Sequence, residues 1–259
     1  MSRELLKKAD ANLKASIKNI AENSPKGEVI EEDDYLISTI GRMSTESHAN
    51  AAFCLDTENA EETFKKVDKY YKDRGMSYVF WIREGIDSEM EEVLKKKGYV
   101  PKREPGLPIM AIDRRIEVPE LEEEYRAVRV KNSQEMRDFI TVVRDCFSLG
   151  ENTAQAMFAS SNVLDGKVNK AYVVYDKSRP VSAVQTYNAG GVSGIYWVAT
   201  SEDMRGKGLG KFITAVGTDE AFNLGAENVV LQASTLGGYV YEKLGYEIIG
   251  YYRTYLIEI

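Results

Sequence analysis

The chain has few of the residues on which secreted, metal-binding and membrane-spanning proteins depend. It contains two cysteines and one histidine, His48, among 259 residues. Two cysteines do not make a disulfide framework, so we predict a reducing, cytoplasmic location and place both Cys54 and Cys146 in the core. No apolar run approaches the roughly 20 residues of a membrane span. The first residues also lack the apolar segment of a signal peptide, and we therefore predict no membrane partner.

An excess of positive charge and the common catalytic motifs are missing too. Lysine and arginine total 34 against 41 aspartates and glutamates, which gives a net charge of −7. This balance argues against a nucleic-acid partner, whose binding surface should be basic, and mildly favours a cationic substrate such as an amine. The sequence has no Gly-x-Ser-x-Gly, no paired cysteine and histidine, and no cluster of metal ligands. We therefore predict neither an enzyme nucleophile nor a metal.

The most informative segment that is present is the glycine-rich stretch Arg-Gly-Lys-Gly-Leu-Gly at residues 205–210. An apolar, strand-like run at residues 195–199 precedes it, and a helical pattern follows. A glycine-rich turn that opens a helix presents free backbone N–H groups and the positive end of the helix dipole, which together bind phosphate. Glycines let the backbone approach a diphosphate closely, and Arg205 and Lys207 add two cations.

Three phosphate-binding motifs, and a plain tight turn, could explain this segment. The string of a P-loop is absent. The alternating glycines do not have the spacing of a dinucleotide fingerprint, which also needs an acidic residue about 20 residues further on. The remaining pattern, Arg-x-x-Gly-x-Gly, resembles the acetyl-CoA loop of the GNAT family of N-acetyltransferases. The order of elements after it is also similar: a strand at residues 229–233, a short helix containing Tyr-Glu-Lys-Leu-Gly-Tyr at residues 241–246, and a last strand at residues 252–259.

The resemblance implies acetyl-CoA as co-substrate, no metal, and direct transfer of the acyl group to an amine. By family analogy, the backbone N–H of Val198 polarises the thioester oxygen, an effect worth about 3 kcal/mol. Tyr241 is the implied general acid for the leaving thiolate, or else a buried structural tyrosine. The implied cofactor-binding residues are Val198, Ala199, Thr200, Arg205, Gly206, Lys207, Gly208, Leu209, Gly210, Lys211, Ser234 and Tyr241. Lys211 could instead be solvated, and Ser234 could instead cap the following helix.

The resemblance leaves the rest of the chemistry open. Many relatives carry a glutamate on the strand before the loop, but here that strand reads Ile-Tyr-Trp-Val-Ala, so no general base is identified. The predicted activity is acetyl transfer to the amine of a small molecule or of an amino terminus, by a monomer or homodimer. The alternatives are transfer of another acyl group or to another acceptor, and a CoA-binding regulatory protein without turnover.

A short sequence repeat, here called the echo, occurs once in each half of the chain and predicts a duplicated fold. Lys-Lys-Gly-Tyr at residues 96–99 parallels Lys-Leu-Gly-Tyr at residues 243–246, and both follow a short helix. We predict an α/β (α+β) protein with two GNAT-like domains, at residues 1–118 and 119–259, each a mixed, mostly antiparallel sheet flanked by helices. A single α+β domain with a coincidental echo is the alternative. Residues 56–62 carry four carboxylates where the second half has its glycine loop, so the first domain should not bind CoA.

Hydrophobic periodicity predicts the remaining elements. An amphipathic helix at residues 2–23 should pack on the rest of the protein, although a membrane-surface helix has a similar pattern. Asn132 or Ser133 should cap a helix at about residues 134–147. Further helices are predicted at residues 60–72, 88–97 and 153–164, and strands at residues 35–40, 50–55, 78–82, 109–112, 125–130, 170–175 and 181–187.

Overall fold

The computed structural model describes residues 3–159 and 168–259 of the protein. They form two compact units, and each unit is assembled from separate stretches of the sequence. Unit 1 combines residues 3–16, 109–155 and 168–249, whereas unit 2 combines residues 17–108, 156–159 and 250–259. Neither unit is a continuous half of the chain. The division into domains 1–118 and 119–259 therefore stays a prediction.

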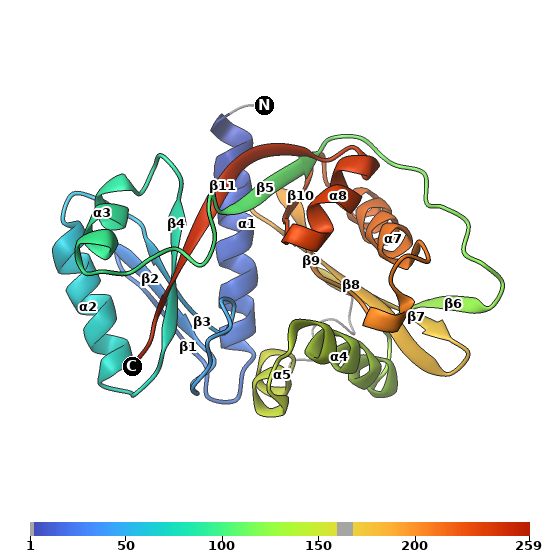
Figure 1. Ribbon diagram of the computed structural model, residues 1–259, viewed down its shortest axis with the longest axis horizontal. Coiled ribbons are helices and arrows are strands. Elements are labelled where there is room, and N and C mark those ends of the chain that lie inside the picture. The colour runs from blue at the N-terminus through green and yellow to red at the C-terminus, as the bar shows by residue number, and fades with distance from the viewer. Residues whose placement is uncertain (1–2, 160–167) are drawn as a thin grey trace. The chain divides into compact units, whose positions relative to one another are not determined.

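Unit 2 is a five-stranded sheet with two helices on one face (Figure 1). Its strands, in spatial order, are β1 (Glu28–Glu31), β2 (Tyr35–Thr39), β3 (Asn50–Cys54), β4 (Tyr78–Arg83) and β11 (Glu247–Ile257). Only the β3–β4 pair is parallel. The helices are α2 (Ala60–Lys72) and α3 (Ser88–Lys96). Their apolar faces, including Phe64, Tyr71 and Leu94, pack on Phe80 and Tyr255 of the sheet.

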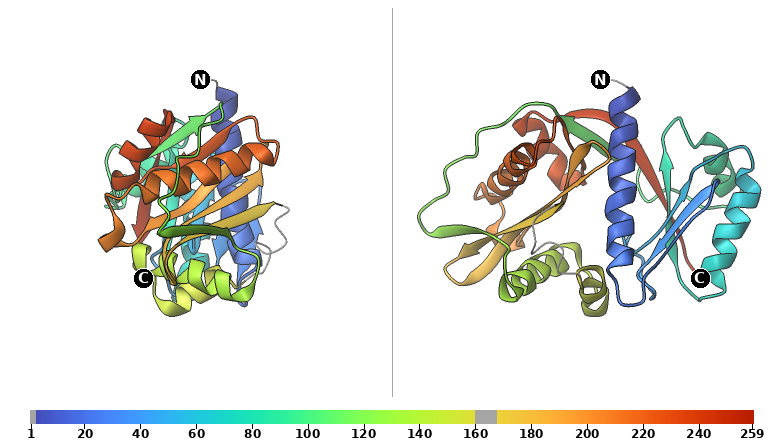
Figure 2. Two further views of the ribbon diagram at one scale, coloured as in Figure 1. Left: turned by 90° about the vertical axis from the view of Figure 1, so that its right-hand side faces the viewer. Right: turned by 180° about the vertical axis from the view of Figure 1, so that it is seen from behind.

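Unit 1 is a six-stranded sheet with helices on both faces. Its strands, in spatial order, are β5 (Leu107–Ile112), β10 (Val229–Gln232), β9 (Val192–Thr200), β8 (Arg179–Ala189), β7 (Asn169–Asp176) and β6 (Tyr125–Arg129). Its helices are α4 (Ser133–Phe147), α5 (Glu151–Met157), the 3₁₀ turn η1 (Glu202–Met204), α7 (Leu209–Asn223) and α8 (Thr235–Leu244). α7 and α8 share one core with the sheet, and α4 lies against the other face (Figure 2).

A strand from the other half of the sequence completes each sheet. In unit 2, β11 pairs with β4 from Tyr252 opposite Arg83 to Ile257 opposite Tyr78. In unit 1, β5 pairs with β10 from Ile112 opposite Val229 to Ile109 opposite Gln232. Both pairings are antiparallel and run the length of the shorter strand.

The first helix, α1 (Arg3–Glu22), is anchored by one buried asparagine. The side-chain amide of Asn12 donates to the carbonyls of Tyr187, Ala189 and Val192 at 3.0, 2.9 and 3.1 Å. Its oxygen accepts the Tyr196 hydroxyl at 2.7 Å. These bonds fix the turn between β8 and β9. Together with the full burial of Ala9, Leu13 and Ile17, they confirm that this helix packs on the protein.

Most of the predicted elements are confirmed, with small differences. Asn132 caps α4, because its side chain accepts the N–H groups of Gln134 and Glu135. Strand β1 was not predicted, since its four residues carry a glutamate at each end. The helix predicted at residues 153–164 begins earlier and ends at Met157, and residues 160–164 lie outside the described residues. Among the described residues, no helix has the length and apolarity needed to cross a membrane.

The predicted echo corresponds to two helix ends with the same backbone hydrogen bonds. Gly98 follows the end of α3 and Gly245 follows the end of α8, with φ values of 86° and 91°. Tyr99 N–H bonds to the Leu94 carbonyl at 3.1 Å, and Tyr246 N–H bonds to the Tyr241 carbonyl at 3.0 Å. Both are Schellman caps, for which glycine is favoured because of the positive φ. This correspondence places Leu94 where the second half has Tyr241.

Candidate active site

The site begins where two parallel strands of unit 1 separate. β10 pairs with β9 at only two positions, Val229 with Ser193 and Val230 with Gly194. Beyond them, β9 continues from residue 195 to residue 200 without a β10 partner in the described chain. The edge of β9 is therefore open on that side. An extended ligand carrying amide groups can pair with such an edge as an added strand would.

A β-bulge interrupts β9 at the start of this open edge. Ala183 of β8 faces Ala199, and Gln185 faces Tyr196, so Val184 alone lies opposite both Trp197 and Val198. Trp197 adopts φ 53°, a left-handed conformation that is unusual for a bulky residue. A bulge leaves backbone N–H and C=O groups outside the hydrogen-bond ladder of the sheet and changes the direction in which they point. This geometry fits the role predicted for the Val198 N–H as a donor to a ligand.

The glycine loop follows β9 directly. Gly206 and Gly208 have φ values of 80° and 79°, and no atom lies within 4 Å of a Cβ built on either residue. Glycine is therefore needed here for backbone conformation, and the space in front of the loop is open. Gly208 is the N-cap of α7, where no side chain caps the helix. The first N–H groups of α7 are thus left for a ligand.

α8 supplies the opposite wall and the tyrosine. Ser234 is its N-cap, and the Ser234 hydroxyl accepts the Gly237 N–H at 3.1 Å, so the capping alternative is observed for this residue. Tyr241 is 7% exposed and packs in the core of unit 1. Its hydroxyl has no hydrogen-bond partner among the described residues. Burial raises the pKa of Tyr241 well above its ordinary value, so the hydroxyl keeps its proton at neutral pH.

These parts line one pocket of about 650 Å³ in unit 1. Ten of the predicted cofactor-binding residues line it: Val198, Ala199, Thr200, Arg205, Gly206, Gly208, Gly210, Lys211, Ser234 and Tyr241. Two others do not. Lys207 is exposed, with its Nζ atom 3.5 Å from the Met204 sulfur, and the Leu209 side chain is buried in the core.

Sequence reasoning missed the residues that reach the pocket from other elements. They are Cys146 and Phe147 at the end of α4, Thr214 of α7, and Leu236, Gly237, Tyr239, Val240 and Lys243 of α8. Cys146 was predicted in the core but is only partly buried and lines the pocket. Phe147 packs edge-on against Trp197 at 5.3 Å. The α8 residues are spaced around Tyr241 as a helix requires, and this spacing was the sequence signal that could have identified them. No local sequence signal marks the end of α4 as part of the pocket.

The charge of the pocket has one sign. Arg205, Lys211 and Lys243 line it, and no carboxylate or histidine is among the lining residues described. The whole chain has a net charge of −7. A set of cations without counter-charges, on an acidic protein, favours an anionic ligand. Thus the pocket fits an anionic ligand such as phosphate, and its described lining residues offer no carboxylate as general base.

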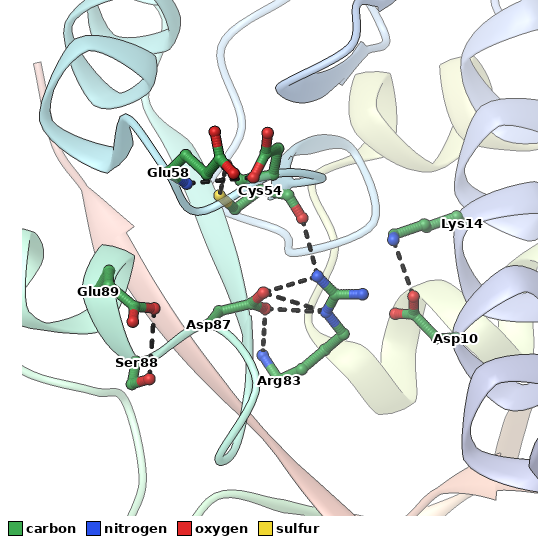
Figure 3. Close-up of polar contacts among 9 residues, drawn as sticks. Asp10, Lys14, Cys54, Glu58, Arg83, Asp87, Ser88 and Glu89 are labelled. Atoms are coloured by element: carbon green, nitrogen blue, oxygen red, sulfur yellow. Dashed lines mark hydrogen bonds and ion pairs between the residues drawn. The ribbon is translucent and has the colours of Figure 1, made fainter. Parts of the chain in front are cut away.

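In unit 2, the parallel strands β3 and β4 correspond to β9 and β10 of unit 1, but they do not separate to form an opening. There, β3 and β4 pair as far as Phe53 opposite Trp81, near the end of β3. One residue further on, the Arg83 guanidinium donates to the Cys54 carbonyl at 3.1 Å (Figure 3). Asp87, which is 1% exposed, holds that guanidinium with bonds of 2.6 and 3.0 Å. The ion pair therefore joins the two strands where unit 1 has its opening.

Comparison with known proteins identifies the fold. No protein-family model and no curated protein matches the sequence. A GCN5-related N-acetyltransferase from Kribbella flavida is similar in structure, with a TM-score of 0.72 and 16% identity over 95% of each chain. One from Sphaerobacter thermophilus has a TM-score of 0.66 and 15% identity over 96% of this chain and 91% of that one.

A tandem GNAT protein from the clavulanic acid biosynthesis pathway, solved without AcCoA, is also similar. Its TM-score is 0.58 at 10% identity, over 91% of this chain and 84% of that one. The chain therefore has the fold of the GCN5-related N-acetyltransferases along most of its length. This confirms the resemblance and the fold class predicted from the sequence.

Proposed function

We propose that the protein is an acetyl-CoA-dependent N-acetyltransferase that transfers the acetyl group directly to the amine of a small molecule or of an amino terminus. The observation that carries the proposal is a single pocket with three features. It combines the open edge of β9, the uncapped glycine-loop end of α7, and the Tyr241 side chain. The fold, shared with proteins named as N-acetyltransferases, supports acyl transfer from CoA in general.

Each feature has a task in this reaction. An acyl thioester supplies an activated carbonyl carbon for the amine to attack. The glycine loop, Arg205 and Lys211 would hold the phosphates, and the open edge at Val198 and Thr200 would orient the amide-bearing arm. The Val198 N–H would stabilise negative charge that develops on the carbonyl oxygen. Tyr241 keeps its proton because it is buried, and it would donate that proton to the departing thiolate.

The pocket constrains the acceptor as well. Because no lining residue described can act as a carboxylate or imidazole base, the amine would arrive neutral or lose its proton to water. The lack of a base among the described lining residues is equally consistent with the alternative, a CoA-binding protein without catalytic turnover. Release of CoA thiol with a panel of neutral and low-pKa amines would separate the two. Tight CoA binding with no thiol release from any acyl-CoA tested would favour a regulatory CoA-binding protein.

The first test of the proposal is the binding of acetyl-CoA to a loop variant. Gly208→Glu puts bulk and a negative charge into the phosphate site, so we expect acetyl-CoA binding to be lost in a calorimetric titration. Gly225→Glu is the matched control, because Gly225 also has a positive φ of 87° and open space around its Cβ position, but lies at the other end of α7.

Both substitutions place a side chain in the left-handed region, at a similar cost of about 1–2 kcal/mol in stability. A difference in binding between the two variants is therefore due to the site. Micromolar affinity retained by Gly208→Glu would overturn the assignment of the loop, and absence of binding by the unmodified protein would overturn the proposed function.

A further inference from the structure

Three large hydrophobic side chains at the pocket are unusually exposed. Among the described residues nine large hydrophobic side chains are exposed, and three of them, Phe147, Leu236 and Tyr239, line this one pocket. Leu236 is 73% exposed and Tyr239 is 64% exposed. They are three residues apart on α8, so they share one face of the helix. Apolar surface left exposed at the rim of a pocket marks a place where a ligand covers it.

A cation accompanies this exposed face. The Nζ atom of Lys243 lies 4.1 Å from the centre of the Tyr239 ring, and Lys243 also lines the pocket. The other lining cations, Arg205 and Lys211, belong to the glycine loop and the first turn of α7. Positive charge therefore reaches the pocket from two different elements. A ligand with a single anionic group, bound at the glycine loop, would have no charge for Lys243 to pair with.

We propose that Tyr239 and Lys243 form a nucleotide subsite, in which Tyr239 stacks on the purine and Lys243 pairs with the 3′-phosphate. The proposal rests on the proposed function, because it takes CoA as the ligand. CoA carries phosphate at two separate places, a pyrophosphate and a 3′-phosphate, with an adenine beside the second. The two groups of cations match these two places, and an aromatic ring is the protein group on which bases stack.

The subsite makes affinity depend on a part of CoA that takes no part in the reaction. Calorimetric titrations with CoA and with dephospho-CoA, which lacks only the 3′-phosphate, measure the role of Lys243. We expect CoA to bind about three- to fivefold more tightly than dephospho-CoA, the ratio that an exposed ion pair gives. Lys243→Met should reduce this ratio to near one. Lys131→Met, at an exposed lysine of unit 1 outside the pocket, should leave it unchanged.

The stacking role is tested at Tyr239. Tyr239→Ala should weaken the binding of both CoA and dephospho-CoA about tenfold, and Tyr239→Phe should restore it, because stacking needs the ring and not the hydroxyl. Phosphopantetheine lacks the nucleotide, so neither the Tyr239→Ala nor the Lys243→Met variant should change its affinity. This ligand also shows that α8 is intact in both variants.

The outcomes separate the two proposals. A ratio of CoA to dephospho-CoA affinity that persists in Lys243→Met would overturn the phosphate role. Equal CoA affinity of Tyr239→Ala and the unmodified protein would overturn the stacking role. If the unmodified protein binds neither CoA nor phosphopantetheine, the proposed function itself fails. Binding of phosphopantetheine as tightly as CoA would leave that function standing and remove the nucleotide subsite.

Discussion

At the scale of single residues, Tyr241 and Tyr246 form an informative pair. The two rings lie 6.1 Å apart, and both residues are buried in the same core. The Tyr246 hydroxyl is 2.7 Å from the Thr218 hydroxyl, whereas that of Tyr241 has no partner among the described residues. A buried polar group is normally hydrogen-bonded. The difference assigns Tyr246 to the core and leaves the Tyr241 hydroxyl for a ligand.

We therefore predict opposite effects of removing the two hydroxyls. Tyr241→Phe should lower the rate of acyl transfer by about 100-fold, because the leaving thiolate loses its proton donor, with CoA affinity nearly unchanged. Tyr246→Phe should keep the rate but lower the free energy of unfolding by about 1 kcal/mol, because Thr218 loses a hydrogen-bond partner. Thiol-release kinetics and chemical denaturation measure these effects. Unchanged turnover in Tyr241→Phe would return Tyr241 to a purely structural role.

At the scale of elements, α7 is tied to β7 by a partly buried carboxylate. Glu220 of α7 accepts hydrogen bonds from Lys170 and Tyr172 of β7. Burial alone would raise the pKa of Glu220, but the bonds from Lys170 and Tyr172 outweigh it, and the pKa is lowered. A carboxyl with a lower pKa in the folded state stabilises the fold above its unfolded pKa of about 4.3, and this contribution disappears as the pH falls.

From this linkage we predict that the stability of the Glu220→Gln variant falls less at acidic pH than that of the unmodified protein. The variant should be less stable than the unmodified protein at neutral pH, and the difference should shrink as the pH falls below about 4. Asp219→Asn is the control, since the ion pair of Asp219 with Arg115 is more exposed. Denaturation midpoints across pH give the comparison. A constant difference between Glu220→Gln and the unmodified protein at all pH values would contradict the linkage.

How far the sequence predicted these elements depends on how local their signals are. The glycine loop and the Asn132 cap are each specified by a few adjacent residues, and both were predicted. The bulge at Trp197 was not, because it is a mismatch in register between two strands. Cys146 reaches the pocket only through the packing of α4, which its own neighbours do not encode.

At the scale of the whole molecule, unit 1 and unit 2 differ at the place where the pocket opens in unit 1. Unit 2 has Leu94 in place of Tyr241 and carboxylates in place of the glycine loop. Its strands also stay paired where those of unit 1 separate. We predict that each chain binds a single CoA, because among the described residues the pocket of unit 1 has room and charge for it, whereas the matching place in unit 2 is closed. Native mass spectrometry or the stoichiometry of titration would measure this, and two CoA molecules per chain would contradict it.

The pairing of β11 with β4 also has a consequence for synthesis. Chains emerge from the ribosome N-terminus first, and domains generally fold in that order. Here β4 has to wait for residues 252–257, which are made long after it. Until then, the edge of β4, including Phe80 and Trp81, has no strand to cover it, and such edges promote aggregation. Most of unit 2 is therefore made before most of unit 1, but its sheet is completed only when residues 252–257 have been made.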